Sequence, residues 1–550
     1  MSQRTVYLIG LDGIPPRLLD EAIEKGHTPT LEELGKTGVK GTTKTVIPPL
    51  SMAAWSSFAT GRDLGGHGIF NFMLKQKGSY NTQFANGSLL HEYSIPYWDY
   101  LDANGLKTGV MNLMPGYPPS ESAGFHIGDL VTSPPDGNYM YPPDLNSEIE
   151  ENVNEYLLYP YSSYTPDKSE RALEQYIEDL FDMEKNRSSI GKYLIQNKDC
   201  DVFNFVFSGS DSIQHCLAHI QDSDHPRHEP ELMNAYAEKP LELLEIYDEF
   251  LNWLQGYADP EDVIIVLSDH GHSSVYSQLN LNSWLYNEGY LNLESNSLTQ
   301  LKAFGYNHLF DVFESVLHKL GLFSKVKSTV AQSGSSDPEE TGNRNLKDLL
   351  TISSMDYDWD ETAAFTIASG GQIYLNTSEE HPAGWITKEN YDEIRESLKD
   401  DLLDLEHPET GEKVIDSVYY GEEIYSDTHA ETRPDLAVLP KDNYQIQYPQ
   451  TMKTQEVFST PPKPGSHTSE TDRTGIFLAT GGGAGGSSVE VDITDYAPTL
   501  MALLGLPVPD SMTGQVRTDV FDIDPTRKNY DGRVVAKRAV RNTIQGIMDQ

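Results

Sequence analysis

The sequence DVFNFVFSGSD, residues 201–211, decides the fold that the chain is expected to adopt. It runs from a short apolar stretch into small and polar residues, a pattern typical of a buried strand that leads into a loop. The same design recurs in VYLIGLDG (residues 6–13), DVIIVLSDHG (262–271) and GIFLATGGG (475–483). The four stretches therefore predict strands of one buried sheet.

Helices are expected between these strands. Ser169 to Asn197, ahead of the strand at 201–207, carries apolar residues at helical spacing. Strands that alternate with helices predict an α/β fold, in which a mostly parallel β-sheet is sandwiched by helices. Ligands of such sheets bind beyond the carboxyl ends of the strands, so the polar clusters that follow all four strands are expected to meet there.

Two parts of the chain lack this regular pattern. Residues 116–165 are rich in Pro, Tyr, Ser and Asp and are interpreted as a long decorated loop, and residues 329–345 are polar and expected to be mobile. Mixed short segments indicate an inserted cap. The predicted division is an α/β catalytic core of residues 1–290 and 440–520, an inserted cap region of residues 291–439, and a C-terminal extension with a helix at 521–550.

The chain is strongly acidic. Of its 550 residues, 84 are Asp or Glu and 40 are Lys or Arg, so the formal net charge is -44. This charge argues against nucleic acid as a partner. Because a surface of one sign repels itself and salt screens that repulsion, the composition favours a halophilic protein over an acidic protein that works in dilute salt.

Cysteine content and hydropathy bear on the compartment. Only Cys200 and Cys216 are present, too few for a disulfide framework, which favours a reducing environment. The N-terminus enters a strand-like run at once without a signal-peptide pattern, and the chain has no apolar run long enough to span a membrane. We therefore expect a cytoplasmic protein with no membrane span.

Carboxylates and imidazoles dominate the polar clusters. Asp211 and His215 are four residues apart, so on a helix they share one face and can bind one ion. Each acidic or imidazole residue alone is more often a helix cap or an ordinary core or surface residue. Their joint position at strand ends favours a divalent-metal site. The candidate ligands are Asp12, Asp211, His215, Asp269, His270 and His467.

A candidate nucleophile lies in VIPPLSMAAW, residues 46–55. Ser51 follows two helix-excluding prolines, Pro48 and Pro49, and precedes an Ala-rich run with good helix propensity. It is therefore expected at the N-terminus of a helix, where free backbone N–H groups favour a phosphate. A plain helix cap is the alternative role, and one residue can fill both roles.

Together these motifs resemble one protein family. Their order in the chain is GLDG (10–13), PPLSMAAWSSFATG (48–61), SGSDSIQH (208–215), LSDHG (267–271) and GSHTSETDRTGIFLATGGG (465–483). This set is similar to the type I phosphodiesterase and nucleotide pyrophosphatase branch of the alkaline phosphatase superfamily. The resemblance implies an alkaline phosphatase-like core that extends to about Gly514, and a hydrolase of phosphoric esters with a small-molecule substrate.

The resemblance also implies roles for single residues. Two divalent ions, zinc first and manganese or iron as alternatives, would activate Ser51 and hold the transferred phosphoryl group between them. Displacement of the leaving group by Ser51 would form a phosphoserine intermediate, which water then opens. The implied ligands are Asp211, His215 and His467 for one ion, and Asp12, Asp269, His270 and the Oγ of Ser51 for the other.

The chain departs from the family pattern after the nucleophile. The nucleotide pyrophosphatases carry an Asn that donates to a phosphate oxygen; here that position holds Phe72, with Asn71 one residue earlier. Asn71 is therefore either a catalytic donor in the transition state or an ordinary turn residue. His219 and His272 are close to the candidate ligands in sequence and are interpreted as outer or surface residues.

The residues leave the type of reaction open. The resemblance favours a phosphodiesterase, with a phosphomonoesterase or a phosphoglycerate mutase-like phosphomutase as alternatives. A sulfatase is disfavoured, because Met52, Ala53 and Ala54 follow Ser51 where formylglycine formation needs a Pro and an Arg. A metal-binding protein without turnover would have no chemical need for six ligands and Ser51 together. Neither the leaving group nor the oligomeric state is encoded in a recognisable motif.

Overall fold

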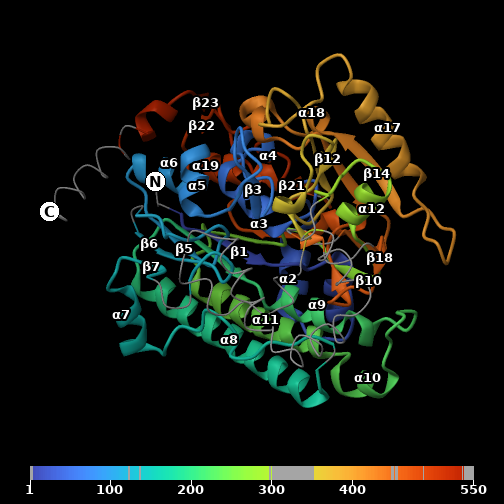
Figure 1. The fold of residues 1–550 in the computed structure, drawn as a ribbon. Coiled ribbons are helices and arrows are strands. Elements are labelled where there is room, and N and C mark those ends of the chain that lie inside the picture. Colours follow the sequence, from blue (N-terminus) through green and yellow to red (C-terminus); the bar gives the residue numbers. More distant parts are fainter. Residues whose placement is uncertain are drawn as a thin grey trace.

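A nine-stranded β-sheet runs through the centre of the molecule (Figure 1). The computed structural model describes residues 4–121, 124–134, 138–166, 168–295, 299, 352–446, 451–452, 456–486, 488–535 and 537. In spatial order the strands of the central sheet are β21 (Glu490–Asp492), β2 (Val39–Lys44), β20 (Thr474–Thr480), β9 (Val263–Leu267), β1 (Val6–Leu11), β8 (Val202–Phe207), β5 (Thr108–Met111), β6 (Gly124–Ile127) and β7 (Met140–Tyr141).

The predicted α/β fold is confirmed. The strands β9, β1, β8, β5 and β6 pair in parallel, and all four stretches that the sequence marked as strands lie in this sheet. The helix predicted from Ser169 is α8 (Glu170–Asn197). A mostly parallel sheet thus forms the middle layer of the protein.

One expectation about the strand ends is wrong. β20 pairs antiparallel with β9, and Thr480 lies opposite Ile264 near the amino end of β9. The glycines of residues 481–486 therefore leave the sheet at the edge opposite to the other polar clusters. The segment that precedes β20 lies instead at the carboxyl edge, which brings His467 to the same edge as the clusters after β1, β8 and β9.

Helices cover both faces of the sheet. Because successive side chains of a strand point to opposite faces, Tyr7 and Ile9 of β1 pack into one core, and Val6 and Leu8 pack into the other. In Figure 1 α8 and α11 lie below the sheet, and α5, α6 and α19 lie above it. The first core contains α1 (Pro16–Glu24), α2 (Pro29–Thr37), α8, α9 (Gly209–Gln221) and α11 (Lys239–Tyr257), and the second contains α3 (Ser51–Thr60), α5 (Gly87–Tyr93), α6 (Tyr97–Ala103) and α19 (Tyr496–Leu503).

Residues 116–165 are more than the predicted loop. They contain β6, β7 and α7 (Leu145–Asn152), and β6 pairs in parallel with β5 as a full member of the sheet. The four residues of β6, GFHI, are too few to give a recognisable period of two, which is why the pattern analysis missed this strand. The stretch is therefore built into the core along part of its length.

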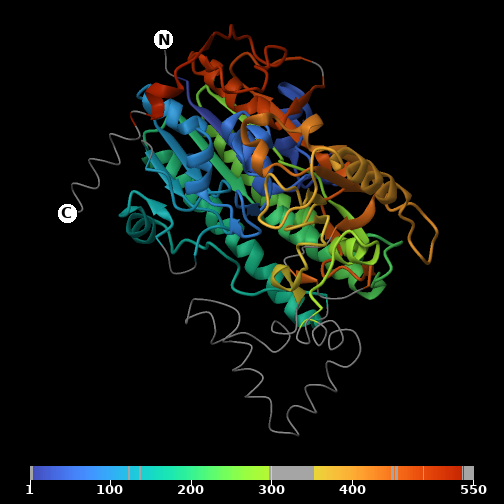
Figure 2. The ribbon, with the colours of Figure 1, turned by 45° about the horizontal axis from the view of Figure 1, so that its top comes forward.

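A second, antiparallel sheet lies beside the central one, and Figure 2 shows this part in yellow to orange. Leu398 and Leu402 of α17 (Tyr391–Asp404) pack into its core. The loop between its first two strands contacts the segment before Ser51: a Cβ atom at Gly370 would lie 3.0 Å from Pro48 Cγ. Its strands are β12 (Ala364–Phe365), β13 (Gln372–Leu375), β15 (Leu436–Pro440) and β14 (Ile415–Tyr420).

Short elements complete the described part. They are α4 (Leu64–His67), β3 (Met73–Lys75), β4 (Thr82–Phe84), α10 (Pro230–Tyr236), β10 (Ser273–Leu279), α12 (Leu281–Asn287), β11 (Ile352–Ser353), η2 (Ser354–Asp356), α18 (Gly421–Ile424), η3 (Asp427–Thr432), β16 (Asn443–Ile446), β17 (Thr451–Met452), β18 (Phe458–Ser459), β19 (Gly465–Ser466), η4 (Thr471–Arg473), η5 (Ile493–Asp495), β22 (Val508–Pro509) and β23 (Arg527–Lys528).

Some predictions lie wholly or partly outside the described residues. The polar segment 329–345 does so entirely, and of the C-terminal extension the structure describes a helical stretch at residues 531–535. The division into core, cap and extension stays a prediction. Within the described residues, no helix has the length and apolar character needed to cross a bilayer. Cys200 and Cys216 are free thiols.

Candidate active site

The parallel strands bring three of the predicted clusters to one edge of the sheet. Asp12 directly follows β1, Asp211 lies in the first turn of α9 after β8, and Asp269 and His270 follow β9. Because β9, β1 and β8 are parallel neighbours, their carboxyl ends meet. His467 joins them from the segment before β20.

Ser51 is the first residue of α3, as the sequence predicted. The helix begins after Leu50, whose backbone is extended and whose side chain cannot cap it, and Ala54 is the first residue whose N–H bonds within the helix, to the Leu50 carbonyl. The N–H groups of Ser51, Met52 and Ala53 are therefore available to an anion. Ser51 Oγ lies 2.9 Å from Nε2 of His270, and only 6% of Ser51 is exposed.

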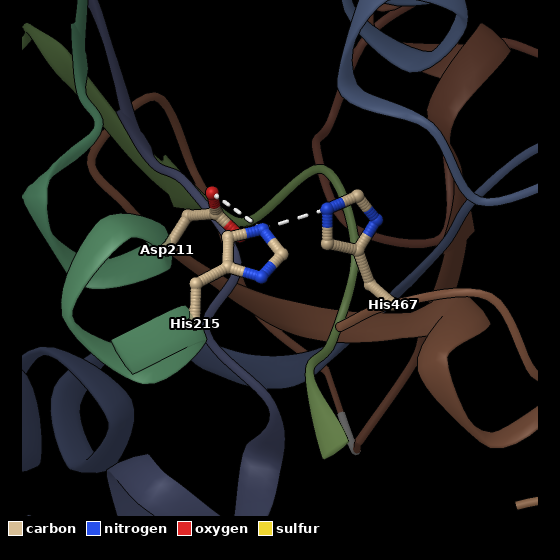
Figure 3. A group of neighbouring side chains, drawn as sticks. All are labelled: Asp211, His215 and His467. Carbon is tan, nitrogen blue, oxygen red and sulfur yellow. Dashed lines mark ion pairs between the residues drawn. The ribbon is translucent and has the colours of Figure 1, made fainter. Parts of the chain in front are cut away.

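Asp211, His215 and His467 form one potential metal-binding group. One ligand atom from each lies within 4.8 Å of the others. Figure 3 shows Asp211 and His215 side by side on α9, with the His467 ring facing them from another segment. The Nε2 of His215 is 3.3 Å from Asp211 Oδ2, and the Nε2 of His467 is 3.7 Å from Asp211 Oδ1.

A second group is formed by Asp12, Asp211 and His270. The Nε2 of His270 is 3.5 Å from Asp12 Oδ1 and 3.2 Å from Oδ2 of Asp269, so Asp269 lies at the edge of this group. All six predicted ligands are thus brought together with Ser51. Asp211 belongs to both groups, which makes it the centre of the cluster.

The imidazoles turn the same nitrogen toward the carboxylates. Nδ1 of His215 bonds to the Gly465 carbonyl at 2.7 Å, and Nδ1 of His467 bonds to the Pro49 carbonyl at 2.7 Å. Nδ1 of His270 bonds to its neighbour's carbonyl at 2.8 Å. A carbonyl only accepts, so each Nδ1 carries the hydrogen, and in the neutral ring each Nε2 is left with a lone pair.

The cluster therefore gathers more hydrogen-bond acceptors than donors, because the Ser51 hydroxyl serves His270 and the Trp55 N–H serves only one oxygen of Asp12. Asp12 Oδ1, Asp211 Oδ1 and Asp269 Oδ2 are buried without a hydrogen-bond partner in the described part of the chain. Buried carboxylate oxygens without partners are costly, and lone pairs and carboxylates that face one another repel. A divalent cation removes both problems, and Asp and His are ligands that zinc and its neighbours accept. These carboxylate oxygens and imidazole nitrogens are therefore suitable ligands for one or two such ions.

Burial and mutual charge perturb these groups strongly. Burial, reinforced by the carboxylates of Asp269 and Asp211, raises the pKa of Asp12 well above its ordinary value. Burial and the Asp211 carboxylate raise the pKa of Asp269 to about 8. Burial lowers the pKa of His270 and of His467, so both rings stay neutral ligands near neutral pH.

Several contacts hold the cluster in shape. Gly13 has a φ of +70°, and a Cβ atom there would lie 2.9 Å from Asp211 Cβ, so glycine is required for the close approach of the two loops. Trp55 Nε1 donates to Asp12 Oδ2 at 3.2 Å. Gln214 Nε2 donates to the Gly13 carbonyl at 2.7 Å. These contacts fix the Asp12 loop against α3 and α9.

His272 lies just outside the cluster, in keeping with the interpretation as an outer residue and not with a surface position. Its side chain is 1% exposed, its Nε2 has no hydrogen-bond partner in the described structure, and that atom lies 3.9 Å from Asp211 Oδ1. Its spacing of two residues from His270 was the available signal. His219, by contrast, is buried beside His225 and Glu229.

Asn71 is oriented toward the second sheet. Its amide nitrogen donates to the Ser369 carbonyl at 2.7 Å and to Gln372 Oε1 at 2.9 Å, and its oxygen accepts from the Phe72 N–H. Both amide hydrogens are therefore bonded to Ser369, in the loop before β13, and to Gln372, the first residue of β13. In this arrangement Asn71 ties the segment between α4 and β3 to the second sheet, and its predicted role as a transition-state donor stays untested.

The raised pKa of Asp269 predicts a pH-dependent effect of D269N in protein stripped of metal. Between its ordinary pKa of 3.8 and about 8, the folded protein holds a proton that the unfolded chain has lost. Rising pH therefore destabilises the wild-type fold by up to about 1.4 kcal/mol per unit for this group. Urea unfolding from pH 4 to 8 should show Asp269→Asn gaining stability relative to wild type as pH rises; a constant difference contradicts the assignment.

A family model described as type I phosphodiesterase / nucleotide pyrophosphatase matches residues 6–470. Curated proteins include none that matches the sequence. A phosphonoacetate hydrolase from Sinorhizobium meliloti 1021 is 14% identical, with 87% of this chain and 90% of that one covered and a TM-score of 0.49. Murine ectonucleotide pyrophosphatase / phosphodiesterase 5 is 14% identical, with 92% and 96% covered and a TM-score of 0.47.

The family match extends over most of the chain and includes Ser51 and all six clustered acidic and imidazole residues. The family predicted from the sequence motifs is thereby confirmed. The chain belongs to the type I phosphodiesterase / nucleotide pyrophosphatase family and is a hydrolase of phosphoric ester bonds.

Proposed function

We propose that the protein is a phosphodiesterase that uses Ser51 as its nucleophile and two divalent metal ions as cofactors. The observation that carries this proposal is the position of Ser51. Its hydroxyl lies at the N-terminus of α3 and 2.9 Å from His270, beside six acidic and imidazole side chains that need a cation. A nucleophile, an anion-binding helix end and a metal-binding cluster thus share one place.

The proposed reaction has two displacements. Ser51 Oγ forms a bond to phosphorus while the bond from phosphorus to the leaving oxygen breaks, and the leaving group departs as an alcohol or a phosphate ester. Water then attacks the phosphoserine and returns Ser51 to its free form. Ions held by the six clustered side chains would supply positive charge that favours the deprotonated hydroxyl and the leaving oxygen.

The chain's own groups orient the substrate. The free N–H groups in the first turn of α3 point at the position of a phosphoryl oxygen and stabilise negative charge there. Trp55 and Gln214 hold the Asp12 loop, so Asp12 keeps its position relative to Ser51 during both steps. Ser51, Asp12 and His270 are buried, so bulk water has little access to them.

Loss of the Ser51 hydroxyl should abolish turnover without loss of metal. We expect Ser51→Ala to reduce kcat by about a thousandfold or more and to remove the burst of product that accompanies phosphorylation. The matched control is Ser56→Ala on the same helix, whose hydroxyl bonds only to the Met52 carbonyl. Rapid-quench kinetics and metal analysis test both variants, and full turnover by Ser51→Ala would make water the nucleophile.

Chelation of the metal should inactivate the wild-type enzyme, and added zinc should restore its activity.

Diesters should be the better substrates. A monoester carries one more unbound phosphate oxygen and favours an additional cationic side chain, whereas no Arg or Lys among the described residues bonds to Ser51, Asp12 or Asp211. We expect kcat/KM for bis(4-nitrophenyl) phosphate to exceed that for 4-nitrophenyl phosphate by about tenfold or more. The reverse order favours a phosphomonoesterase, and phosphoryl transfer within a phosphorylated acid without release of phosphate favours a phosphomutase.

We propose zinc as the resident metal and a cytoplasmic, halophilic working environment. Imidazole-rich clusters suit zinc, and two free thiols suit a reducing compartment.

The net charge of -44 predicts that the free energy of unfolding rises between low and molar potassium chloride, because salt screens the repulsion between carboxylates. Urea unfolding curves across this range test the prediction; a stability that is independent of salt contradicts it.

A further inference from the structure

A buried ion pair lies against the turn that carries Asp211. Glu184 and Arg187 are three residues apart on α8, and both side chains are 0% exposed. The Nη1 of Arg187 lies 2.8 Å from Glu184 Oε1. Charges hidden from water reduce stability unless their hydrogen bonds are well matched, so a pair in this position calls for a reason.

The pair contacts the turn at adjacent residues. Arg187 Nη1 donates to Ser208 Oγ at 2.8 Å, and the Gly209 N–H donates to Glu184 Oε1 at 3.0 Å. A Cβ atom at Gly209 would lie 2.6 Å from Glu184 Cγ, which shows how closely the carboxylate packs on the turn. The N-terminal end of α9, two residues before Asp211, is thus held by charged groups of α8.

The same network reaches two other parts of the chain. Arg187 Nη2 donates to the Leu158 carbonyl at 3.0 Å, which joins residues 138–166 to the turn. On the other side, Ser210 Oγ donates to the backbone carbonyl of Asp12 at 2.5 Å. The pair therefore lies between the segment that contains Leu158 and the two loops that carry Asp12 and Asp211.

The pair is poorly suited to a purely stabilising role. Glu184 Oε2 and Arg187 Nε are buried and have no hydrogen-bond partner in the described structure. Apolar side chains of similar size would fill the same volume without this cost. They could not, however, bind the Ser208 hydroxyl and the Gly209 N–H.

We propose that Glu184 and Arg187 are positioning residues that set the orientation of Asp211, and through it both metal-binding groups. The inference rests on the proposed two-metal function. Asp211 belongs to both groups, so a small rotation of the α9 end changes the distance from its two oxygens to His467 and His270 at once. The ion pair acts on the metals only through Asp211 and does not touch them.

The test is an apolar replacement of the pair, Glu184→Leu with Arg187→Met, in the full-length chain. Because no buried charge is left unpaired, this double variant is expected to fold. Titration of the metal-free protein with zinc against a chelating indicator should show binding of at least one ion weakened by about 10- to 100-fold. Cobalt titration should show altered visible bands, which report ligand geometry and do not follow global stability.

Two further variants make the result decisive. Lys198→Met removes the ion pair between the end of α8 and Glu148 of α7, and it should leave zinc affinity unchanged. Ser208→Ala removes only the hydroxyl that accepts from Arg187 and should weaken zinc binding in the same direction as the double variant. If the double variant does not fold, Ser208→Ala decides the question.

The positioning role is overturned if the folded double variant keeps wild-type zinc affinity and wild-type cobalt bands. If the double variant is unfolded, the same result in Ser208→Ala overturns it. Failure of wild type itself to bind two ions contradicts the proposed function instead, so the two failures are distinct.

Discussion

At the carboxyl edge of the sheet, carboxylate oxygens and imidazole nitrogens repel one another. The structure of the site depends on how this repulsion is relieved. Three carboxylates and three imidazole Nε2 atoms meet there, and oxygens of Asp12, Asp211 and Asp269 have no partner among the described residues. Folding stability alone disfavours such a cluster, since apolar or paired groups would cost less. A divalent cation would relieve this repulsion, and in the proposed function it would also supply the charge that phosphoryl transfer requires.

The scaffold keeps the cluster together through backbone contacts. The Nδ1 atoms of His215, His467 and His270 are each tied to a main-chain carbonyl, which fixes both the tautomer and the direction of the ring. Glycine at position 13 permits the Asp12 loop to approach α9. Ligand positions therefore depend on loops whose shape is set by the sheet beneath them.

The two sheets meet close to Ser51. Gly370 packs on Pro48 and Leu50, and Asn71 bonds to Ser369 and Gln372 of the second sheet. The segment that presents Ser51 is thus in contact with the second sheet's loop. Glu184 and Arg187 bond to Ser208 and Gly209 at the start of α9. Buried contacts therefore hold the segments that carry Ser51 and Asp211.

The sequence by itself determined the family, the mostly parallel sheet, the start of α3 at Ser51 and which six acidic and imidazole side chains cluster beside it. These features follow from local patterns: apolar runs that end in Asp or Ser, prolines before a helix, and an i, i+4 pair on α9. The tertiary structure alone decided that β20 runs antiparallel, that β6 joins the sheet, that His272 faces Asp211 and that Asn71 bonds to the second sheet. Contacts between residues far apart in the chain decide the direction of a strand, the pairing of a four-residue strand and which side chains lie opposite each other. No local sequence pattern encodes these contacts.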